Sequence, residues 1–153
     1  MQETVVILHN IRSAHNVGSI FRTADAAGVS KIYLAGVTPT PIDRFGRTRK
    51  DIGKVALGAE QSMYWEHVSD TVPLLQRLKG EGVQIVAVEQ APSAISYREF
   101  EPRCPTGFVF GNEVEGISEE IVRHSDAVVA IPMRGSKESL NVSVAAGIIL
   151  FHF

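Results

Sequence analysis

Amide and guanidinium side chains follow the first strongly apolar run of this chain. The stretch HNVGSIFRTAD, residues 15–25, contains Asn16 and Arg22 but a single glycine, Gly18. An amide forms hydrogen bonds with hydroxyls, and a guanidinium binds a phosphate through parallel N–H groups. Taken alone, the pattern favours a structural interpretation, in which Asn16 caps a helix that starts at Val17 and Arg22 lies on its polar face.

A second polar stretch, FVFGNEVEGIS, covers residues 108–118. A buried strand runs into Gly111, Asn112 and Glu113, and a second glycine, Gly116, follows. Gly111 permits close approach of the backbone to a ligand, and Gly116 permits a turn. The alternative is an ordinary strand-to-helix loop in which Asn112 satisfies backbone groups.

A third stretch, AIPMRGSKESLNVSVAAG, covers residues 130–147. A strand ends in Ile-Pro-Met, and a polar loop then enters a helix. Ser139 or Asn141 would be a good N-cap, but Ser139, Asn141 and Ser143 together exceed what one cap requires. Ligands of parallel sheets bind at the carboxyl ends of strands, so all three stretches are candidate site segments.

The elements that must position these side chains alternate between strands and helices, which predicts an α/β fold around a mostly parallel sheet with helices on both faces. Five apolar runs read as buried strands: 5–8, 31–35, 83–89, 107–111 and 127–133. Helices are expected from Val17 to a stop at Gly28, over 48–61, over 72–79 (capped by Asp70 or Thr71, stopped by Gly80 and Gly82), and from Ser118 to 123.

The last segment, SLNVSVAAGIILFHF, is apolar on nearly every face in its second half. A helix of that kind must be buried on most sides. Ala145, Ala146 and Gly147 would let another backbone approach closely. We expect the segment to thread into the domain, to pack on a second subunit, or to do both.

Composition indicates one globular domain over residues 1–153, with 44% hydrophobic and 21% charged residues. A single cysteine, Cys104, forbids an internal disulfide and favours a reducing cytosol. No apolar run reaches the roughly 18 residues of a membrane span, and the start lacks the charged region of a signal peptide. We expect a cytoplasmic protein that avoids membranes, and we assign no residue to a metal.

Basic side chains gather in the first third, although the net charge is −2. Residues 1–54 hold eight Lys or Arg and four acids, whereas the remainder holds seven and thirteen. The cluster DRFGRTRKDIGK, residues 43–54, sets Phe45 between arginines as a stacking surface beside phosphate-binding groups. Taken alone, the sequence favours a solvated loop here.

Taken together and in this order, the three stretches closely resemble the SpoU/TrmH-type RNA ribose methyltransferases of the SPOUT superfamily. NVGSIFRTADAAGV is similar to the family's first motif, FVFGNEVEGIS to its second and IPMRGSKESLNVSVAAGI to its third. The resemblance runs from about Val5 to Phe153. It implies a C-terminal deep trefoil knot and a homodimer, which would bury the apolar last helix.

The resemblance also implies S-adenosyl-L-methionine, bound in the knot largely by backbone groups. The residues that it assigns to the cofactor are Gly111, Ile131 and Leu140, with Met133, Val88 and Glu89 as weaker additions. A glycine-rich turn after the first strand is missing, as this interpretation requires. Dinucleotide enzymes and Rossmann-type methyltransferases need that turn.

The implied reaction is methyl transfer to a ribose 2′-hydroxyl of RNA, with tRNA favoured over rRNA. A hydroxyl is a poor nucleophile until its proton is drawn off or polarised. By resemblance, Arg22 is the central catalytic residue, Asn16, Ser139 and Asn141 hold ribose, phosphate and guanidinium, and Glu113 orients Arg22 or the loops. An amide and a guanidinium suit a ribose beside a phosphate, either with Arg22 as a base or, more in keeping with its pKa, as an electrostatic clamp.

RNA contact then falls to the basic surface, for which the candidates are Arg12, Arg44, Arg47, Arg49, Lys50 and Lys54. One alternative is a non-catalytic RNA-binding module with the same fold. Loss of the motif residues would have favoured it, yet Asn16, Arg22 and Asn141 are all present. Another is an α/β enzyme of small nucleotides, which binding of a nicotinamide cofactor would indicate.

Overall fold

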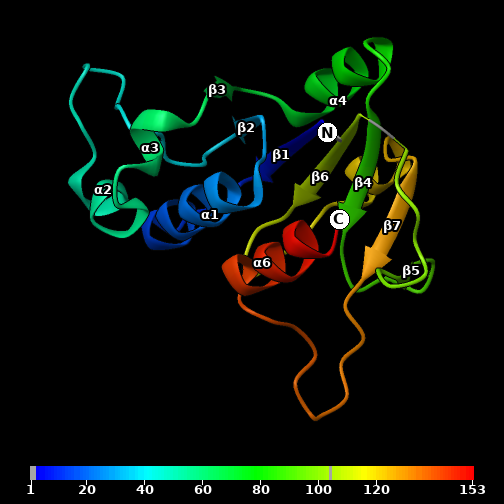
Figure 1. Cartoon of the computed structure of the whole chain (residues 1–153). Coiled ribbons are helices and arrows are strands. Elements are labelled where there is room, and N and C mark those ends of the chain that lie inside the picture. The colour runs from blue at the N-terminus through cyan, green and yellow to red at the C-terminus, as the bar shows by residue number, and fades with distance from the viewer. Residues whose placement is uncertain (1–2, 104) are drawn as a thin grey trace.

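A seven-stranded, all-parallel sheet forms the centre of the computed structural model, which describes residues 3–103 and 105–153 (Figure 1). Cys104, on which the disulfide prediction rests, lies outside the described residues. The strand order is β3-β2-β1-β6-β4-β7-β5. The strands are β1 Thr4–His9, β2 Lys31–Ala35, β3 Trp65–Val68, β4 Gln84–Val88, β5 Ile95–Ser96, β6 Thr106–Phe110 and β7 Ala127–Ala130.

Continuous apolar sequence explains the central strands. β6 is buried at every position, and it pairs with β1 on one side and β4 on the other. Phe108 lies opposite Val6 and Val86 in these two ladders. A parallel strand covered on both faces needs this kind of uniform hydrophobicity.

Helices cover both faces of the sheet, which confirms the predicted architecture. One face carries α1 Ala14–Ala27, α2 Lys50–Ala56, α3 Ala59–Ser62 and α6 Val142–His152, and the other carries α4 Thr71–Gly80 and α5 Glu119–Arg123. Alternate side chains of β1 divide between the two cores, with Val6 and Leu8 in the first and Val5 and Ile7 in the second. This alternation is the period of two that a strand imposes.

Several element boundaries differ from the prediction. The expected helix over 48–61 is two short helices, because Leu57 and Gly58 both adopt positive φ (54° and 96°). β7 ends at Ala130 instead of continuing to 133, just before Pro132, which has no N–H to donate. α4 includes Gly80 and is closed by Glu81. Gly28 ends α1 in the left-handed conformation, as predicted.

The C-terminal helix α6 packs against α1 with one side buried and leaves apolar side chains on the other. Ala146 and Ile149 are fully buried, whereas Val144 and Phe151 are 50% and 64% exposed. Within a single chain the helix is therefore not buried on most sides, and the expectation that a second subunit covers the rest stays a prediction. Among the described residues, no helix is long and apolar enough to cross a membrane.

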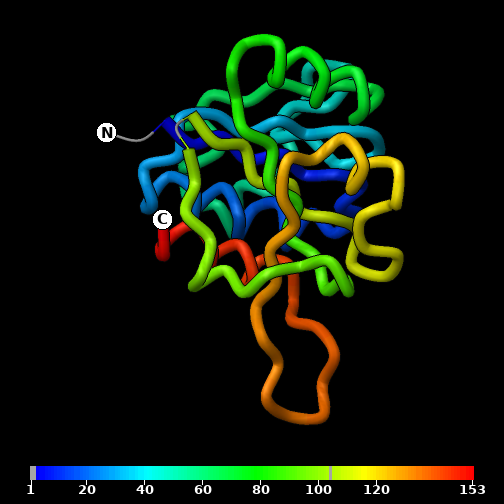
Figure 2. Tube along the Cα trace, turned by 90° about the vertical axis from the view of Figure 1, so that its right-hand side faces the viewer, coloured from blue at the N-terminus to red at the C-terminus, as the bar shows by residue number. Residues whose placement is uncertain are grey.

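The segment between β7 and α6 leaves the body of the molecule as an extended loop (Figure 2). Residues 134–141 in this loop are exposed. It carries the third polar stretch from the carboxyl end of β7 to the start of α6. The loop therefore links the carboxyl end of β7, the sheet edge at which parallel sheets bind ligands, to α6, the helix that leaves apolar side chains exposed.

Candidate active site

The loops that follow β1, β6 and β7 bring the three polar stretches to one edge of the sheet. β1 ends at His9, β6 at Phe110 and β7 at Ala130, and all three strands run in the same direction. The carboxyl ends of parallel strands meet at a common edge. Side chains more than 100 residues apart in sequence consequently become neighbours.

Ser13 begins helix α1, so the prediction of Asn16 as the N-cap is wrong. Ser13 has extended backbone, and its side chain accepts a hydrogen bond from the Asn16 N–H (3.1 Å). Asn16 lies in the first turn and is only 6% exposed. Its amide is therefore available for longer-range contacts.

Asn16 connects the second and third stretches through its two amide atoms. Its Nδ2 donates to Glu113 Oε1 (3.2 Å), and its Oδ1 accepts from Asn141 Nδ2 (3.2 Å). Asn141 also caps α6, as predicted, by accepting from the Ser143 N–H (2.9 Å). The amide–carboxylate chain Glu113–Asn16–Asn141 thus joins all three motifs.

Glu113 also receives the first N–H groups of the segment that leads into α1. The Arg12 and Ser13 N–H groups donate to its two oxygens at 3.3 Å each. Burial opposes ionisation of Glu113, but hydrogen bonds from its own backbone, Asn16, Arg12 and Ser13 outweigh it and lower the pKa. Glu113 is therefore held as an anion at the N-terminus of α1, where negative charge is favoured.

Asn112 and Asn10 fix the two loops against each other. Asn112 Nδ2 donates to the Asn10 carbonyl (2.8 Å), and its Oδ1 accepts from the Val114 and Glu115 N–H groups. The prediction that Asn112 satisfies backbone groups is confirmed. Sequence reasoning missed Asn10, which adopts φ 52°; asparagine after a strand was a signal, because it tolerates left-handed backbone better than other non-glycine residues.

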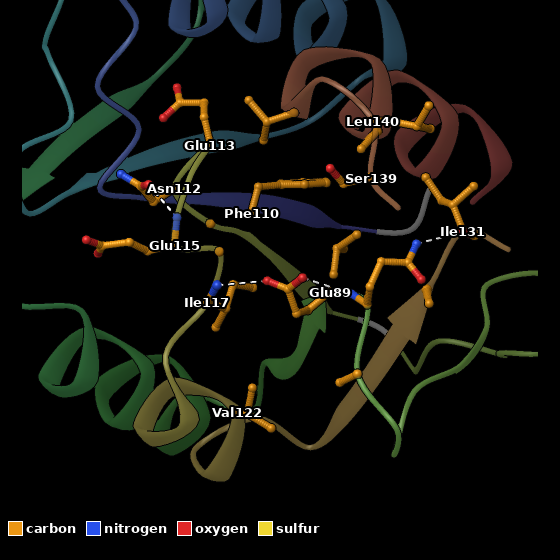
Figure 3. Close-up of a pocket in the computed structure, with 18 of the residues that line it drawn as sticks. Glu89, Phe110, Asn112, Glu113, Glu115, Ile117, Val122, Ile131, Ser139 and Leu140 are labelled. Carbon is orange, nitrogen blue, oxygen red and sulfur yellow. Dashed lines mark hydrogen bonds between the residues drawn. The ribbon is translucent and has the colours of Figure 1, made fainter. Parts of the chain in front are cut away.

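A cavity of about 770 Å³ lies beside the hydrogen-bonded chain Glu113–Asn16–Asn141, between the ends of β4, β6 and β7 (Figure 3). Phe110, Ile117, Ile131 and Leu140 contribute apolar surface to it, and Glu113 and Ser139 contribute polar groups. Of the predicted cofactor residues, it is lined by Val88, Glu89, Gly111, Ile131 and Leu140. Ser139 and Asn141 line it too, whereas Met133 does not.

A close backbone approach at Gly111 and the hydrogen bonds of Glu89 and Gln90 shape the cavity wall. A Cβ at Gly111 would lie 2.6 Å from the Gly116 carbonyl carbon, so the loop's own fold already requires glycine there. Glu89 accepts from the Ile117 N–H (2.8 Å) and the Gln90 N–H (2.9 Å), and Gln90 Nε2 donates to the Ile131 carbonyl (2.7 Å). Sequence reasoning missed Gln90.

Arg22 does not belong to this cluster within one chain. It is exposed on α1, and it is absent from the cavity lining. Arg22 lies six residues after Asn16, which rotates its side chain by roughly 240° about the helix axis and moves it about 9 Å along that axis. The two side chains therefore lie on different faces of α1. Among the described residues, no group of three or more His, Asp or Glu side chains is placed to hold a metal.

The predicted RNA-binding side chains lie on a different part of the molecule, apart from Arg12. Arg44 and Arg47 are in the loop after β2, and Lys50 and Lys54 are in α2, across the molecule from β7 (Figure 1). Arg47 pairs with Asp43 (3.0 Å), and Arg49 pairs with Asp51 (2.8 Å). These two arginines are therefore less available for phosphate than their number suggests.

Comparison with known proteins places the whole chain among RNA methyltransferases. It is 36% identical over 150 residues to the tRNA (guanosine(18)-2′-O)-methyltransferase of Aquifex aeolicus, covering 98% of this chain and 68% of that protein. With the corresponding enzyme of Escherichia coli K12 the figures are 32% identity over 149 residues, 97% and 62%. The chain thus spans about two thirds of these curated relatives.

Solved structures agree with this placement. The AdoMet-bound rRNA methyltransferase from Sinorhizobium meliloti superposes with a TM-score of 0.89 and 33% identity, covering 99% of this chain and 56% of that one. The SpoU rRNA Methylase family matches residues 3–151, which contain all three polar stretches. The chain belongs to the SpoU rRNA Methylase family.

Proposed function

We propose that this chain transfers a methyl group from S-adenosylmethionine to a ribose 2′-hydroxyl of structured RNA. The observation that carries the proposal is the amide–carboxylate chain Glu113–Asn16–Asn141 at the side of the cavity. Neutral amides fixed in this way suit a hydroxyl-bearing sugar. The Aquifex and Escherichia coli relatives are named for tRNA 2′-O-methylation, which favours tRNA over rRNA.

The cavity fits S-adenosylmethionine in chemistry and size. Val88, Phe110 and Ile131 offer apolar surface for an adenine ring, and each Glu89 oxygen keeps a lone pair for a ribose hydroxyl. The lining holds four glutamates and one arginine, a balance that favours a cationic ligand. When bound, the sulfonium supplies a methyl group that is already activated.

The acceptor hydroxyl needs help from the protein, because it is a weak nucleophile. Asn16, Asn141 and Ser139 are placed to hold the ribose in one orientation beside the cavity. Glu113 keeps Asn16 and the start of α1 fixed. Such fixed groups lower the barrier by orienting the reacting atoms.

Arg22 supplies the positive charge in this proposal. A guanidinium keeps its proton above pH 12, so a clamp on an RNA phosphate that also stabilises the developing 2′-oxyanion is the better account. Within one chain Arg22 lies away from the cavity. The proposal therefore needs a second protomer, or the RNA itself, to bring Arg22 and the ribose together.

A homodimer through α6 and α1 meets that need. Val144 and Phe151, seven residues apart on α6, leave apolar side chains 50% and 64% exposed on its open side. In a twofold dimer such an apolar surface packs against the same surface of the second copy. A sedimentation experiment that finds only monomer at micromolar concentration would contradict it.

A C-terminal knot is supported by what α6 touches. The ring of His152 packs edge-on against that of Tyr97, with 4.8 Å between the ring centroids. The Phe153 ring packs edge-on against Phe100 (centroids 5.9 Å apart) and stacks on Phe108 (centroids 5.4 Å apart). Residues 97–100 belong to the segment between β4 and β6, which passes the red end of α6 in Figure 2. Contact between the last helix and an earlier connection is what a threaded chain requires. We propose that residues 1–153 form one such domain and act on RNA in the cytoplasm.

The decisive test is transfer of a labelled methyl group. Purified protein is incubated with methyl-labelled S-adenosylmethionine and unmodified tRNA or rRNA, and the RNA is digested to nucleosides. The label should appear in a 2′-O-methylnucleoside. Binding of both ligands without transfer would instead favour the non-catalytic RNA-binding module.

A further inference from the structure

The loop after β2 folds into a short hairpin, Pro41–Arg49, which we call the Phe45 hairpin. Ile42 and Thr48 form an antiparallel bridge, and the Arg49 N–H donates to the Pro41 carbonyl (2.8 Å). Its turn is closed by Gly46, whose N–H donates to the Asp43 carbonyl (3.0 Å) and whose φ is 76°. Only glycine adopts such a φ without strain, so the turn is well specified.

The Asp43 side chain stabilises the hairpin by accepting hydrogen bonds from residues within it. Its Oδ1 accepts from the Phe45 N–H (2.8 Å) and the Arg47 N–H (2.9 Å), and its Oδ2 accepts from Arg47 Nε (3.0 Å). The hydrogen bond from the Arg47 backbone is the main cause that lowers the pKa of Asp43. The carboxylate therefore stays ionised, and the hairpin stays organised, at neutral pH.

Phe45 stands exposed at the tip of this hairpin. Its residue surface is 65% exposed, although the Arg44 and Arg47 guanidinium carbons lie 4.8 and 5.0 Å from the ring centroid. An exposed ring that contacts two guanidinium groups and belongs to neither core cluster of the described residues has no packing role in the core. It has the features of a stacking platform.

The charge around the ring is positive. Residues 41–54 contain five Lys or Arg and two Asp. Asp43 and Asp51 pair with Arg47 and Arg49, which leaves Arg44, Lys50 and Lys54 without an ion pair in the part of the chain that the structure describes. A phosphate near the ring would meet an uncompensated charge on Arg44.

We propose that the Phe45 hairpin binds an unpaired nucleotide of the RNA substrate, with the base stacked on the Phe45 ring and the neighbouring phosphate on Arg44. That the polymer is RNA rests on the proposed function. A base inside a duplex has both faces covered, so the hairpin selects a loop or bulge over a helix. The hairpin lies across the molecule from β7 (Figure 1), whose last residue, Ala130, lines the cavity, and it thereby adds a second point of contact to the proposed reaction site.

The test uses two forms of one probe, a 12-nucleotide RNA that contains 2-aminopurine, free as a single strand or annealed to its complement. Phe45→Ala should raise the Kd for the single strand roughly fivefold to 150-fold and change the Kd for the duplex by less than twofold. Phe45→Trp should retain binding and quench the fluorescence of the base. A single-strand Kd within twofold of the natural protein, an equal loss on both forms, or no binding of the single strand by the natural protein would overturn the inference.

Two further variants separate stacking from simple charge. Asp43→Ala removes a negative charge and also the side chain that organises the hairpin. If the hairpin binds RNA by charge alone, the variant should bind the single strand more tightly, and that result would overturn the inference. If the organised hairpin is needed for stacking, the variant should bind the single strand more weakly. Tyr64→Ala removes another exposed aromatic residue (78% exposed), one on which no described guanidinium stacks, and an equal loss there would overturn it too. The labelled-methyl assay of the natural protein judges the proposed function separately, because methyl transfer with an unaffected Phe45→Ala Kd removes only the hairpin's role.

Discussion

Glu113 and Asp43 each organise a loop by accepting several hydrogen bonds, but their partners lie at very different distances along the chain. Glu113 accepts from Arg12, Ser13 and Asn16, about 100 residues earlier. Asp43 accepts from Phe45 and Arg47, two and four residues later. The first carboxylate joins segments that only the folded sheet brings together, and the second builds a local hairpin.

This difference separates two tasks. The amide–carboxylate chain is part of the tertiary structure, so a change there should alter the geometry that is proposed to hold a ribose. The Phe45 hairpin is self-contained and exposed, so a change there affects contact with a partner while the core is undisturbed. We expect variants of the two regions to differ in kind as well as in size.

The largest effect is expected at Arg22. Arg22→Lys should lower kcat for methyl transfer roughly 100- to 1000-fold, because the lysine loses the planar fork that stabilises developing charge. Calorimetric titration should find the affinity for S-adenosylmethionine nearly unchanged. A large loss of that affinity would mean that Arg22 belongs to the cofactor cavity, and an unchanged kcat would remove it from catalysis.

A smaller loss is expected for Glu113→Gln. The neutral amide accepts less strongly from the Arg12 and Ser13 N–H groups and from Asn16, so kcat should fall on the order of 10-fold. Steady-state kinetics measures the change. Glu120→Gln is the control, since it removes the same charge from an exposed residue outside the cavity lining, and an equal loss in both variants would contradict the positioning role of Glu113.

The salt dependence of RNA binding should distinguish free from paired cations. Replacing Arg44 and Lys50 together by alanine should flatten the slope of log K against log salt by about 1.4, as for two single-strand phosphate contacts. Arg49→Ala should change the slope by less, because Asp51 already pairs with that guanidinium. A larger change for Arg49 alone would reverse this assignment.

The smallest effect concerns pH. Both Glu113 and Asp43 have a pKa below the ordinary value, so their stabilisation is present above the unfolded pKa and is lost as pH falls through the folded pKa. Denaturant titrations should show a constant contribution from both groups between about pH 7 and 5, and a declining one below about pH 4. For Glu113→Gln that decline should be smaller than for the natural protein. An identical decline would show that Glu113 contributes nothing to it.

The sheet was largely predictable because its central strands are continuous apolar runs. β3 was missed because Glu66 and His67 interrupt its apolar character at the edge of the sheet, and β5 because it is only two residues long. The break between α2 and α3 was missed because Leu57 carries a positive φ that leucine rarely adopts. Local residue preferences do not predict a leucine in this backbone conformation.

The candidate site was predictable in membership more than in arrangement. The family resemblance implied roles for Asn16, Glu113 and Asn141, but not that one amide would join the other two. The assignment of Asn16 to the cap failed because Ser13, three residues earlier, takes that position. Gln90 and Asn10 were missed because their roles depend on backbone groups of distant segments.

The division between the two regions is tested most directly by comparing the steady-state kinetics of methyl transfer to tRNA for Arg22→Lys and Phe45→Ala. The proposed mechanism predicts that Arg22→Lys loses kcat with little change in the KM for tRNA. It predicts that Phe45→Ala raises that KM by more than it lowers kcat. A Phe45→Ala variant that loses kcat at an unchanged KM, or an Arg22→Lys variant with the kcat of the natural protein, would contradict the division.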